Sequence, residues 1–221
     1  MVAPVAASAS EVSWTFSGVI TGESGDVGNL VNVAGSVVGL SITGSVSYDT
    51  GVFGTPNTFG TSVVAAWDST GGTLPNGTLT ITETINGVTF GFSGAYYNGL
   101  LLAYGSPGSG DWPYSDWTQA YEVLSETSTP WGVDAAEINL GRPDETVALV
   151  DPSLSASAPP NLAAIQDQVA GTDWFTAAGP ASWGFDITEA QEVPEPGALG
   201  LLGVGVAGLG AARRGRGDAR G

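Results

Sequence analysis

Apolar and polar residues alternate along several short stretches of the chain, and this alternation predicts β-strands. In residues 11–20, EVSWTFSGVI, every second residue from Val12 to Phe16 is apolar, and the residues between them are Ser or Thr. Successive side chains of a strand point to opposite faces, so this pattern is typical of a strand with one buried and one solvated face.

The clearest hairpin lies in residues 78–93, TLTITETINGVTFGFS. Asn86-Gly87 separates two alternating runs, and this dipeptide favours the two-residue type I′ turn because both of its residues accept a positive φ. The predicted buried face of this hairpin consists of Leu79, Ile81, Phe90 and Phe92.

Similar stretches predict further strands, and one stretch predicts a helix. Residues 161–169, NLAAIQDQV, favour a short helix with Asn161 as its N-cap. Many short strands with glycine-rich turns favour an all-β fold, here a two-sheet β-sandwich of jelly-roll type with one short helix. The further strands are expected near 36–48, 95–104, 117–125, 135–140, 145–150 and 182–189.

The composition agrees with an all-β domain. The chain has 34 glycines among 221 residues and only 12% charged residues, which favours short strands joined by tight turns. Its 42% hydrophobic content and seven tryptophans allow a buried core, and they argue against disorder.

Charge is distributed very unevenly along the chain. Residues 1–193 contain 20 acidic residues and a single basic one, Arg142, whereas residues 194–221 contain two acidic residues and four arginines. Binding to nucleic acid or to anionic lipid headgroups requires a basic surface. The acidic body therefore predicts no nucleic-acid partner and a soluble, self-repelling surface.

The absence of His, Cys and Lys from the sequence excludes several classes of enzyme. The chain cannot form a Ser-His-Asp or Cys-His site, a His-ligated metal centre or a Schiff base. Carboxylate chemistry remains, for example a glycosidase pair such as Glu83 and Glu122. Because twenty scattered acids form chance pairs easily, we predict a non-enzymatic protein with a solvated anionic surface and no catalytic residues.

Two acidic segments could supply oxygen ligands to calcium. These are Glu23 with Asp26, and Asp111 with Asp116, but neither spacing matches the EF-hand loop. We therefore predict no metal site and no cofactor, with calcium as a minor alternative.

Aromatic and acidic residues alternate in residues 109–117, SGDWPYSDW. Trp112, Tyr114 and Trp117 could stack on a sugar ring while neighbouring acids bind its hydroxyl groups. The alternative is that these rings close one end of the hydrophobic core. The first interpretation predicts a carbohydrate-binding loop, and the second a purely structural one.

Both ends of the sequence have the character of processing segments. Residues 1–10, MVAPVAASAS, contain the Ala7-Ser8-Ala9 pattern that ends many signal peptides, and we interpret them as a remnant of an export signal. Residues 198–212 are apolar throughout, but as a helix they would span only about 22 Å of a hydrocarbon core about 30 Å thick. The predicted organisation is a β-sandwich at 11–189, followed at 190–221 by a linker and a hydrophobic helical tail.

The C-terminal segment, VPEPGALGLLGVGVAGLGAARRGRG, resembles the PEP-CTERM sorting signal of exported bacterial proteins. The resemblance lies in the order of three parts, and the extension GDARG after the basic cluster departs from the usual pattern. The parts are Pro194, Glu195 and Pro196 as sorting motif, the apolar run, and Arg213, Arg214 and Arg216 as basic stop.

This resemblance implies export in a Gram-negative bacterium, transient retention in the inner membrane and processing by a membrane-embedded exosortase. The body shows a looser resemblance to small β-rich proteins with this tail, through residues 44–50 (GSVSYDT) and the loop at 149–162. Because such proteins mostly have no assigned activity, this second resemblance supports an architecture only.

Three functional hypotheses follow from the sequence. The leading one is an exported protein that is released to the cell surface or extracellular matrix and has a non-enzymatic structural or adhesive role. The first alternative is a carbohydrate-binding module acting on exopolysaccharide. The second is a carboxylate glycoside hydrolase, which requires a cleft with two facing acids, one of raised pKa.

Overall fold

Strands dominate the computed structural model, which describes residues 11–58, 63–69, 74–104, 119–142, 147–150, 156, 160–165, 167–176 and 178–193. The helices within these ranges are α1 (Val27–Leu30) and the 3-10 helices η1 (Thr50–Val52) and η2 (Leu162–Ala164). The strands are β1 (Glu11–Ser24), β2 (Ser41–Asp49), β3 (Asn57–Thr58), β4 (Val63–Asp68), β5 (Leu79–Ile85), β6 (Val88–Phe92), β7 (Tyr97–Tyr104), β8 (Gln119–Thr129), β9 (Gly132–Arg142), β10 (Asp167–Thr176) and β11 (Gly179–Glu192).

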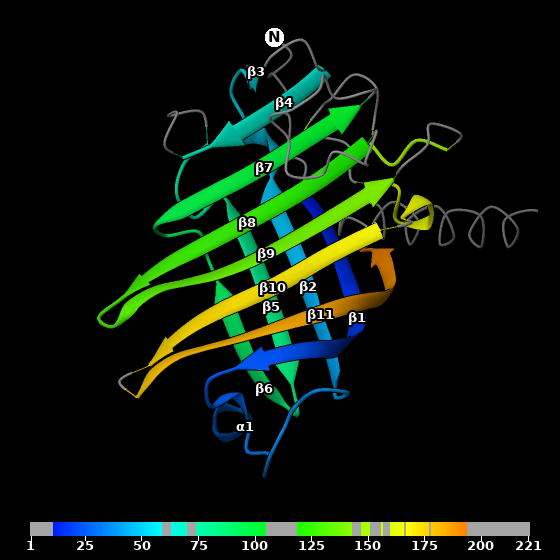
Figure 1. The fold of residues 1–221 in the computed structure, drawn as a ribbon. Helices are drawn as coiled ribbons and strands as arrows, with labels where there is room; N and C mark the ends of the chain where they lie inside the picture. Colours follow the sequence, from blue (N-terminus) through cyan, green and yellow to red (C-terminus); the bar gives the residue numbers. More distant parts are fainter. Residues whose placement is uncertain are drawn as a thin grey trace, which may run out of the picture.

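These strands form one antiparallel sheet in the order β3-β4-β7-β8-β9-β10-β11-β1-β2-β5-β6. The sheet curls so that strands β3, β4 and β7 to β10 form a front layer over a rear layer of β2, β5 and β6 (Figure 1). The predicted all-β class is confirmed. The prediction of two separate, jelly-roll-like sheets is wrong, because hydrogen bonding continues without a break from β3 to β6.

Strands β1 and β11 join the two layers by running through both of them (Figure 1). Strand β1 pairs with β2 only as far as Val19, whereas its pairing with β11 continues to Ser24. The register of the β1–β11 pair shifts at Ser17/Gly18 and again at Ile20/Gly22, and such bulges bend a strand and increase its twist. A Cβ at Gly18 would lie 2.2 Å from the Asp186 carbonyl oxygen, so the bend requires glycine there.

Apolar side chains from both layers fill the space between them, as the alternation in residues 11–20 predicts. Trp14 and Phe16 are buried, and the Phe16 ring stacks on Phe185 of β11. Two hydroxyl groups continue the contacts between the layers: Trp14 Nε1 donates to the Tyr121 hydroxyl, 3.4 Å away, and Tyr121 in turn donates to the Tyr48 hydroxyl at 3.3 Å. The core is therefore mainly hydrophobic, with a few internal hydrogen bonds that connect β1, β2 and β8.

The predicted hairpin at 78–93 is confirmed. Asn86 and Gly87 have φ of 47° and 79° between β5 and β6, as a type I′ turn requires. The Asn86 side chain also donates to the Val31 carbonyl oxygen at 2.8 Å, which connects this turn to the segment that follows β1. The four predicted inward residues, Leu79, Ile81, Phe90 and Phe92, are all buried.

Other predictions differ from the structure. The helix predicted at 161–169 is only the 3-10 turn η2, after which the chain pairs with β9 as strand β10. Residues 36–40 and 147–150 are not strands, and β3, β4 and α1 were not predicted. Of the predicted linker and tail at 190–221, residues 190–192 are not linker, because they pair with β1 as the end of β11. Residues 194–221 and residues 1–10 lie outside the described residues. Within the described ranges, no helix has the length and apolar character needed to cross a membrane.

Candidate functional site

Many of the predicted site residues lie outside the described part of the chain. This holds for the sorting motif Pro194, Glu195 and Pro196, and for the basic stop Arg213, Arg214 and Arg216. It also holds for the aromatic residues Trp112, Tyr114 and Trp117 and for the acids Asp111 and Asp116. The predictions about these positions therefore remain predictions.

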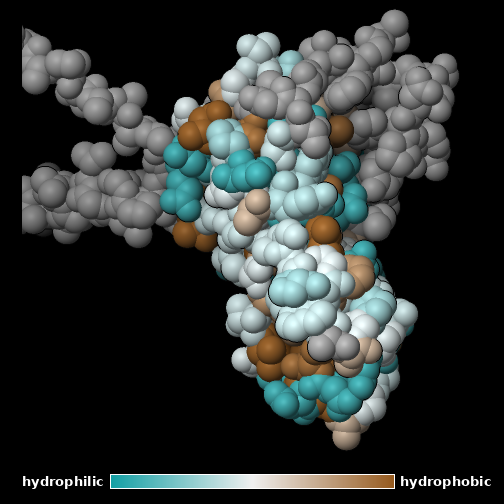
Figure 2. Space-filling view, turned by 90° about the vertical axis from the view of Figure 1, so that its left-hand side faces the viewer, coloured by the Kyte–Doolittle hydropathy of each residue, from teal (hydrophilic) through white to brown (hydrophobic). Residues whose placement is uncertain are grey.

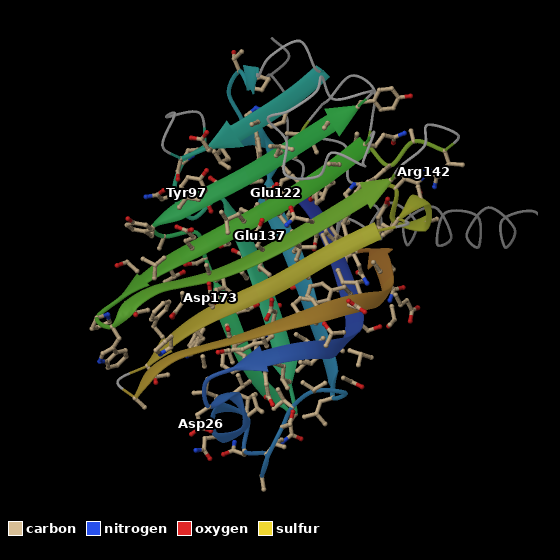
Figure 3. All side chains as sticks on the ribbon, viewed as in Figure 1. Asp26, Tyr97, Glu122, Glu137, Arg142 and Asp173 are labelled. Carbon is tan, nitrogen blue, oxygen red and sulfur yellow. The ribbon has the colours of Figure 1, made fainter. Side chains whose placement is uncertain are left out.

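Glu23 and Asp26, the other predicted calcium ligands, each accept a hydrogen bond from the protein. Glu23 Oε2 accepts from the Val37 backbone N–H at 3.0 Å, and Asp26 Oδ2 accepts from the Asn29 side chain. Figure 3 shows Asp26 beside α1, at the foot of the sheet. Both carboxylates thus hold the segment between β1 and β2 in place.

Glu83 on β5 points into the space between the layers and is fully buried. The Thr172 hydroxyl lies 2.8 Å from each of its carboxylate oxygens, and Trp183 Nε1 donates to Oε2 at 2.8 Å. Burial raises the pKa of Glu83 to about 7, although these two hydrogen bonds act in the opposite direction. The carboxylate therefore links the rear layer to β10 of the front layer and to the joining strand β11, and it is enclosed by the protein.

Glu122 on β8 lies on the outer face of the front layer, because its neighbours Tyr121 and Val123 are buried inward. Partial burial raises its pKa to about 7, and the negative charge of Glu137 adds to this shift. Glu83 thus lies between the two layers, whereas Glu122 lies on the outer face of the front layer. The pair considered for a glycosidase does not share one site.

Among the described side chains of β8, β9 and β10, three further carboxylates share the outer face with Glu122. They are Glu126 on β8, Glu137 on β9 and Asp173 on β10, and we call these four residues the outer acidic face. Figure 3 shows Glu122 and Glu137 on neighbouring strands, with Asp173 farther down the same layer. Burial, followed by repulsion from Glu137, also raises the pKa of Glu126. Unfavourable like-charge contacts are therefore concentrated on this face.

An open hollow of about 460 Å³ lies on this face. Its floor includes Gly171 and Gly184, which are directly paired on β10 and β11 and have no side chains to fill the space. Glu126, Glu137, Asn139 and Asp173 contribute to its lining, together with small residues such as Ala135 and Ser182. The hollow is thus polar and acidic, and glycine backbone forms part of its base.

Asn139 is an unusual member of this lining. Its side chain is only 2% exposed, and its Nδ2 donates to Glu137 Oε1 at 2.8 Å. Its Oδ1 is the one enclosed side-chain N or O atom in the described part of the chain that has no hydrogen-bond partner. Glu122 lies directly opposite Asn139 across the β8–β9 pair. A buried carbonyl oxygen therefore lacks a donor beside two carboxylates.

The outer face of the rear layer differs from the outer acidic face in its chemistry. Hydroxyl side chains of β1, β2 and β5 form three aligned rows, and Ser45 and Thr82 hydrogen-bond across two strands at 2.7 Å. A hollow of about 480 Å³ lies over part of this array. The array consists of Ser13, Thr15, Ser17, Thr43, Ser45, Ser47, Thr80, Thr82 and Thr84.

The rest of the visible surface is mainly polar. In Figure 2, hydrophilic and intermediate residues cover most of the described surface, and hydrophobic patches are separated from one another. The large aromatic side chains that are exposed in the described ranges are Tyr96, 55% exposed, and Trp131, 58% exposed at the β8–β9 turn. Neither residue is among the predicted site residues.

The pairing of Glu122 with Asn139 could have been found from a hairpin signal. Pro130 and Trp131 form a two-residue connection between the paired residues Thr129 and Gly132, and counting back from this turn brings Glu122 opposite Asn139. The predicted strands at 117–125 and 135–140 left a longer gap, which did not define the register.

No group of three or more His, Cys, Asp or Glu side chains within the described ranges is arranged to hold a metal ion.

Comparison with protein families matches residues 192–214 to the PEP-CTERM protein-sorting motif. The chain therefore carries a PEP-CTERM motif, and its sequence resemblance to such sorting signals is confirmed. The motif begins at Glu192, the last residue of β11, so the sorting segment follows directly after the body of the protein. No curated protein and no solved structure matches the chain.

Proposed function

We propose that this chain is an exosortase substrate that is released to the cell surface or extracellular matrix, where its acidic β-domain has a non-enzymatic structural or adhesive role. The observation that carries the proposal is the PEP-CTERM motif at 192–214, since this motif is associated with export and exosortase processing. The organism in this proposal is a Gram-negative bacterium that has an exosortase.

The tail itself supports transient retention in the inner membrane. Its apolar run, Ala198–Ala212, is short for a permanent span, and Arg213, Arg214 and Arg216 would remain on the cytoplasmic side. In this orientation the acidic body lies outside the cytoplasm. Exosortase would then recognise Pro194, Glu195 and Pro196 and detach the body.

A processing experiment tests this proposal. The full chain is produced in a bacterium with a functional exosortase and in the same strain without the exosortase gene. We expect a shorter, released form only in the first strain, and uncleaved, membrane-associated chain in the second. Replacing Pro194, Glu195 and Pro196 by alanine should also prevent release, whereas the control Glu189→Ala, which lies outside the motif, should not. Exosortase-independent release would contradict the proposal.

A structural role fits the chemistry of the body. The interior carboxylate Glu83 is occupied by Thr172 and Trp183, and the outer acidic face is an open surface. A strongly negative surface keeps an exported domain soluble and lets it interact with cations in a matrix. A strain that lacks the gene should form a less cohesive matrix, and an unchanged matrix would argue against an adhesive role.

A carbohydrate-binding module acting on exopolysaccharide is the alternative, and the exposed aromatic ring of Trp131 favours it. Trp112, Tyr114 and Trp117 remain the predicted sugar-stacking residues. Retention of the protein on purified exopolysaccharide should fall in Trp112→Ala, Trp117→Ala or Trp131→Ala if this function is correct. Unchanged retention in all three variants would exclude these aromatics as sugar contacts.

Glycoside hydrolysis is the less favoured alternative. Glu122 and Glu137 are neighbouring acids, and the pKa of Glu122 is raised to about 7, as a general acid requires. However, they lie on an open face, and a glycosidase needs a cleft that binds the sugar and limits access of water. Hydrolysis of exopolysaccharide that disappears in Glu122→Gln would support the enzyme and contradict the non-enzymatic proposal.

A further inference from the structure

Asn139 Oδ1 is buried and has no hydrogen-bond partner in the described part of the chain. A buried polar atom without a partner is unfavourable, and native proteins contain few such atoms. The orientation of this amide is fixed by its own hydrogen bond, because Nδ2 donates to Glu137 Oε1 at 2.8 Å. Rotating the amide would direct its oxygen at a carboxylate, so Oδ1 must face whatever else occupies the site.

Two carboxylates lie around this oxygen. Glu122 is directly opposite Asn139 across the β8–β9 ladder, and Glu137 is two residues away on the same face of β9. Side chains that are opposite or diagonal across such a pair are close enough to interact. One ion could therefore contact oxygens from all three residues.

The hollow of about 460 Å³ on the outer acidic face provides room for an ion and its water molecules beside Gly171 and Gly184. Glu137 pairs with Gly171 on β10, and even an added Cβ at Gly171 would find its nearest neighbour 3.8 Å away, at the Trp183 carbonyl oxygen. Glu137 and Asn139 both line the hollow. Water molecules in this space could complete the coordination of an ion.

The electrostatic environment favours a cation. Repulsion from Glu137 contributes to the raised pKa of Glu122, and Glu126 and Asp173 add negative charge on the same face. The one basic residue of residues 1–193 is Arg142, the last residue of β9. Its guanidinium donates a hydrogen bond to the carbonyl oxygen of Ala164 in η2. A bound cation would neutralise the two glutamates and give Asn139 Oδ1 a partner.

We propose that Glu122, Glu137 and Asn139 form a binding site for a divalent cation, and that the cation is Ca²⁺. Carboxylate and amide oxygens are typical calcium ligands, and calcium accepts irregular, partly hydrated coordination, whereas Mg²⁺ requires near-octahedral geometry. The absence of imidazole and thiolate ligands disfavours zinc and copper. This site goes beyond the proposed function, and exosortase processing does not depend on it.

Calcium titration of the full 221-residue chain tests the site. We expect one saturable Ca²⁺ per chain by calorimetry, with a dissociation constant on the order of 0.1–1 mM, as in extracellular calcium modules. Calcium should also raise the melting temperature, and NaCl at equal ionic strength should not. If calcium and NaCl have the same effect, charge screening alone explains the data and the proposal is wrong.

Three variants and two controls localise the ion. Glu122→Gln and Glu137→Gln should each weaken calcium binding by at least about tenfold, because even groups outside the ligand shell change metal affinity by that factor. Without calcium, both variants should be at least as stable as the parent chain, since repulsion is relieved. The controls Glu126→Gln and Asp173→Asn remove a charge from the same face and should keep the calcium affinity within about twofold.

Asn139→Asp gives the most specific result. It adds a third carboxylate, so the melting temperature in EDTA should fall, and the calcium affinity should rise because calcium affinity depends on the number of charged ligands. A variant that is less stable in EDTA and gains no calcium affinity would overturn the site. So would an equal loss of affinity in the control variants, because binding would then reflect only the general negative charge.

Discussion

Two glutamates have a pKa raised to about 7: Glu83, in the interior between the layers, and Glu122, on the outer face of the front layer. The cause of the raised pKa differs between these two regions. Glu83 is fully buried, and two hydrogen-bond donors, Thr172 and Trp183, partly compensate for its burial. Glu122 is only partly buried, and burial and repulsion from Glu137 act in the same direction. The same shift therefore arises in a group that accepts hydrogen bonds in one region and in a group that faces a like charge in the other.

This difference separates a structural carboxylate from a candidate binding group. A carboxylate with donors on both of its oxygens belongs to the packing of the protein, and removing it leaves the donors without partners. A carboxylate among like charges can be removed without leaving an unsatisfied donor. Substitutions in the two regions should consequently have opposite effects on stability.

The largest effect is expected for Glu83→Ala. The substitution leaves Trp183 Nε1 and the Thr172 hydroxyl without an acceptor in the interior, and each such loss costs about 1–3 kcal/mol. Together with the cavity, the free energy of unfolding should fall by about 3–5 kcal/mol in urea denaturation. A loss below about 1 kcal/mol would mean that Glu83 does not connect the layers.

Glu83→Gln tests the ionisation of the same residue. The folded state raises the pKa of Glu83 from 4.5 to about 7, so its contribution to stability is complete below about pH 4.5 and decreases as pH rises towards about 7. The parent chain should therefore lose stability relative to Glu83→Gln by up to about 1.4 kcal/mol per pH unit across this range. The difference between the two unfolding curves should be constant above about pH 7.5. A difference that does not change between pH 4.5 and pH 7 would refute the assignment.

Thr172→Val should have a smaller effect, because it removes one of the two donors and retains the size of the side chain. We expect a loss of about 1 kcal/mol in unfolding free energy. Since this hydrogen bond lowers the pKa of Glu83, the stability loss with pH should also extend to higher pH than in the parent chain. Urea denaturation at several pH values measures both effects, and an unchanged pH range would indicate that Trp183 alone stabilises the carboxylate.

Glu122→Gln should have the smallest effect, and its sign should be opposite. In EDTA at pH 8, removal of the like-charge contact with Glu137 should stabilise the fold by about 0.5–1 kcal/mol. Thermal unfolding beside the control Asp173→Asn, which leaves the contacts among Glu122, Glu126 and Glu137 unchanged, measures this gain. If Glu122→Gln is instead destabilising, the outer carboxylate has a donor and the comparison between the two regions fails.

The sequence predicted local features of the fold better than the way in which the layers connect. The alternation of apolar and polar residues around Trp14 depends only on residues close in sequence, and so does the turn at Asn86-Gly87. Both predictions agree with the structure. The helix predicted from Asn161 is wrong because pairing with β9 draws the following residues into β10. The single curled sheet depends on the bend of β1 and β11 at Gly18, which involves contacts between the two ends of the body.

The candidate site could be predicted only in part. The sequence identified Glu122 as a potentially functional acid, but it paired it with Glu83, which lies in the interior. Its actual neighbours, Glu137 and Asn139, depend on the exact register of the β8–β9 hairpin. The unsatisfied Oδ1 of Asn139 depends on three-dimensional packing, and no sequence pattern encodes it.

The position of β11 has a mechanical consequence for a protein with a sorting tail. Strand β11 lies between β10 and β1, and the segment matched by the sorting motif begins at its last residue. A force applied along the strand through Val193 would load the hydrogen bonds to β1, between Glu192 and Ser182, and those to β10, between Phe185 and Gly179, in shear. Because these bonds would have to break together, the body should withstand traction while it is tethered, more than it would if the tail followed a strand at the edge of the sheet.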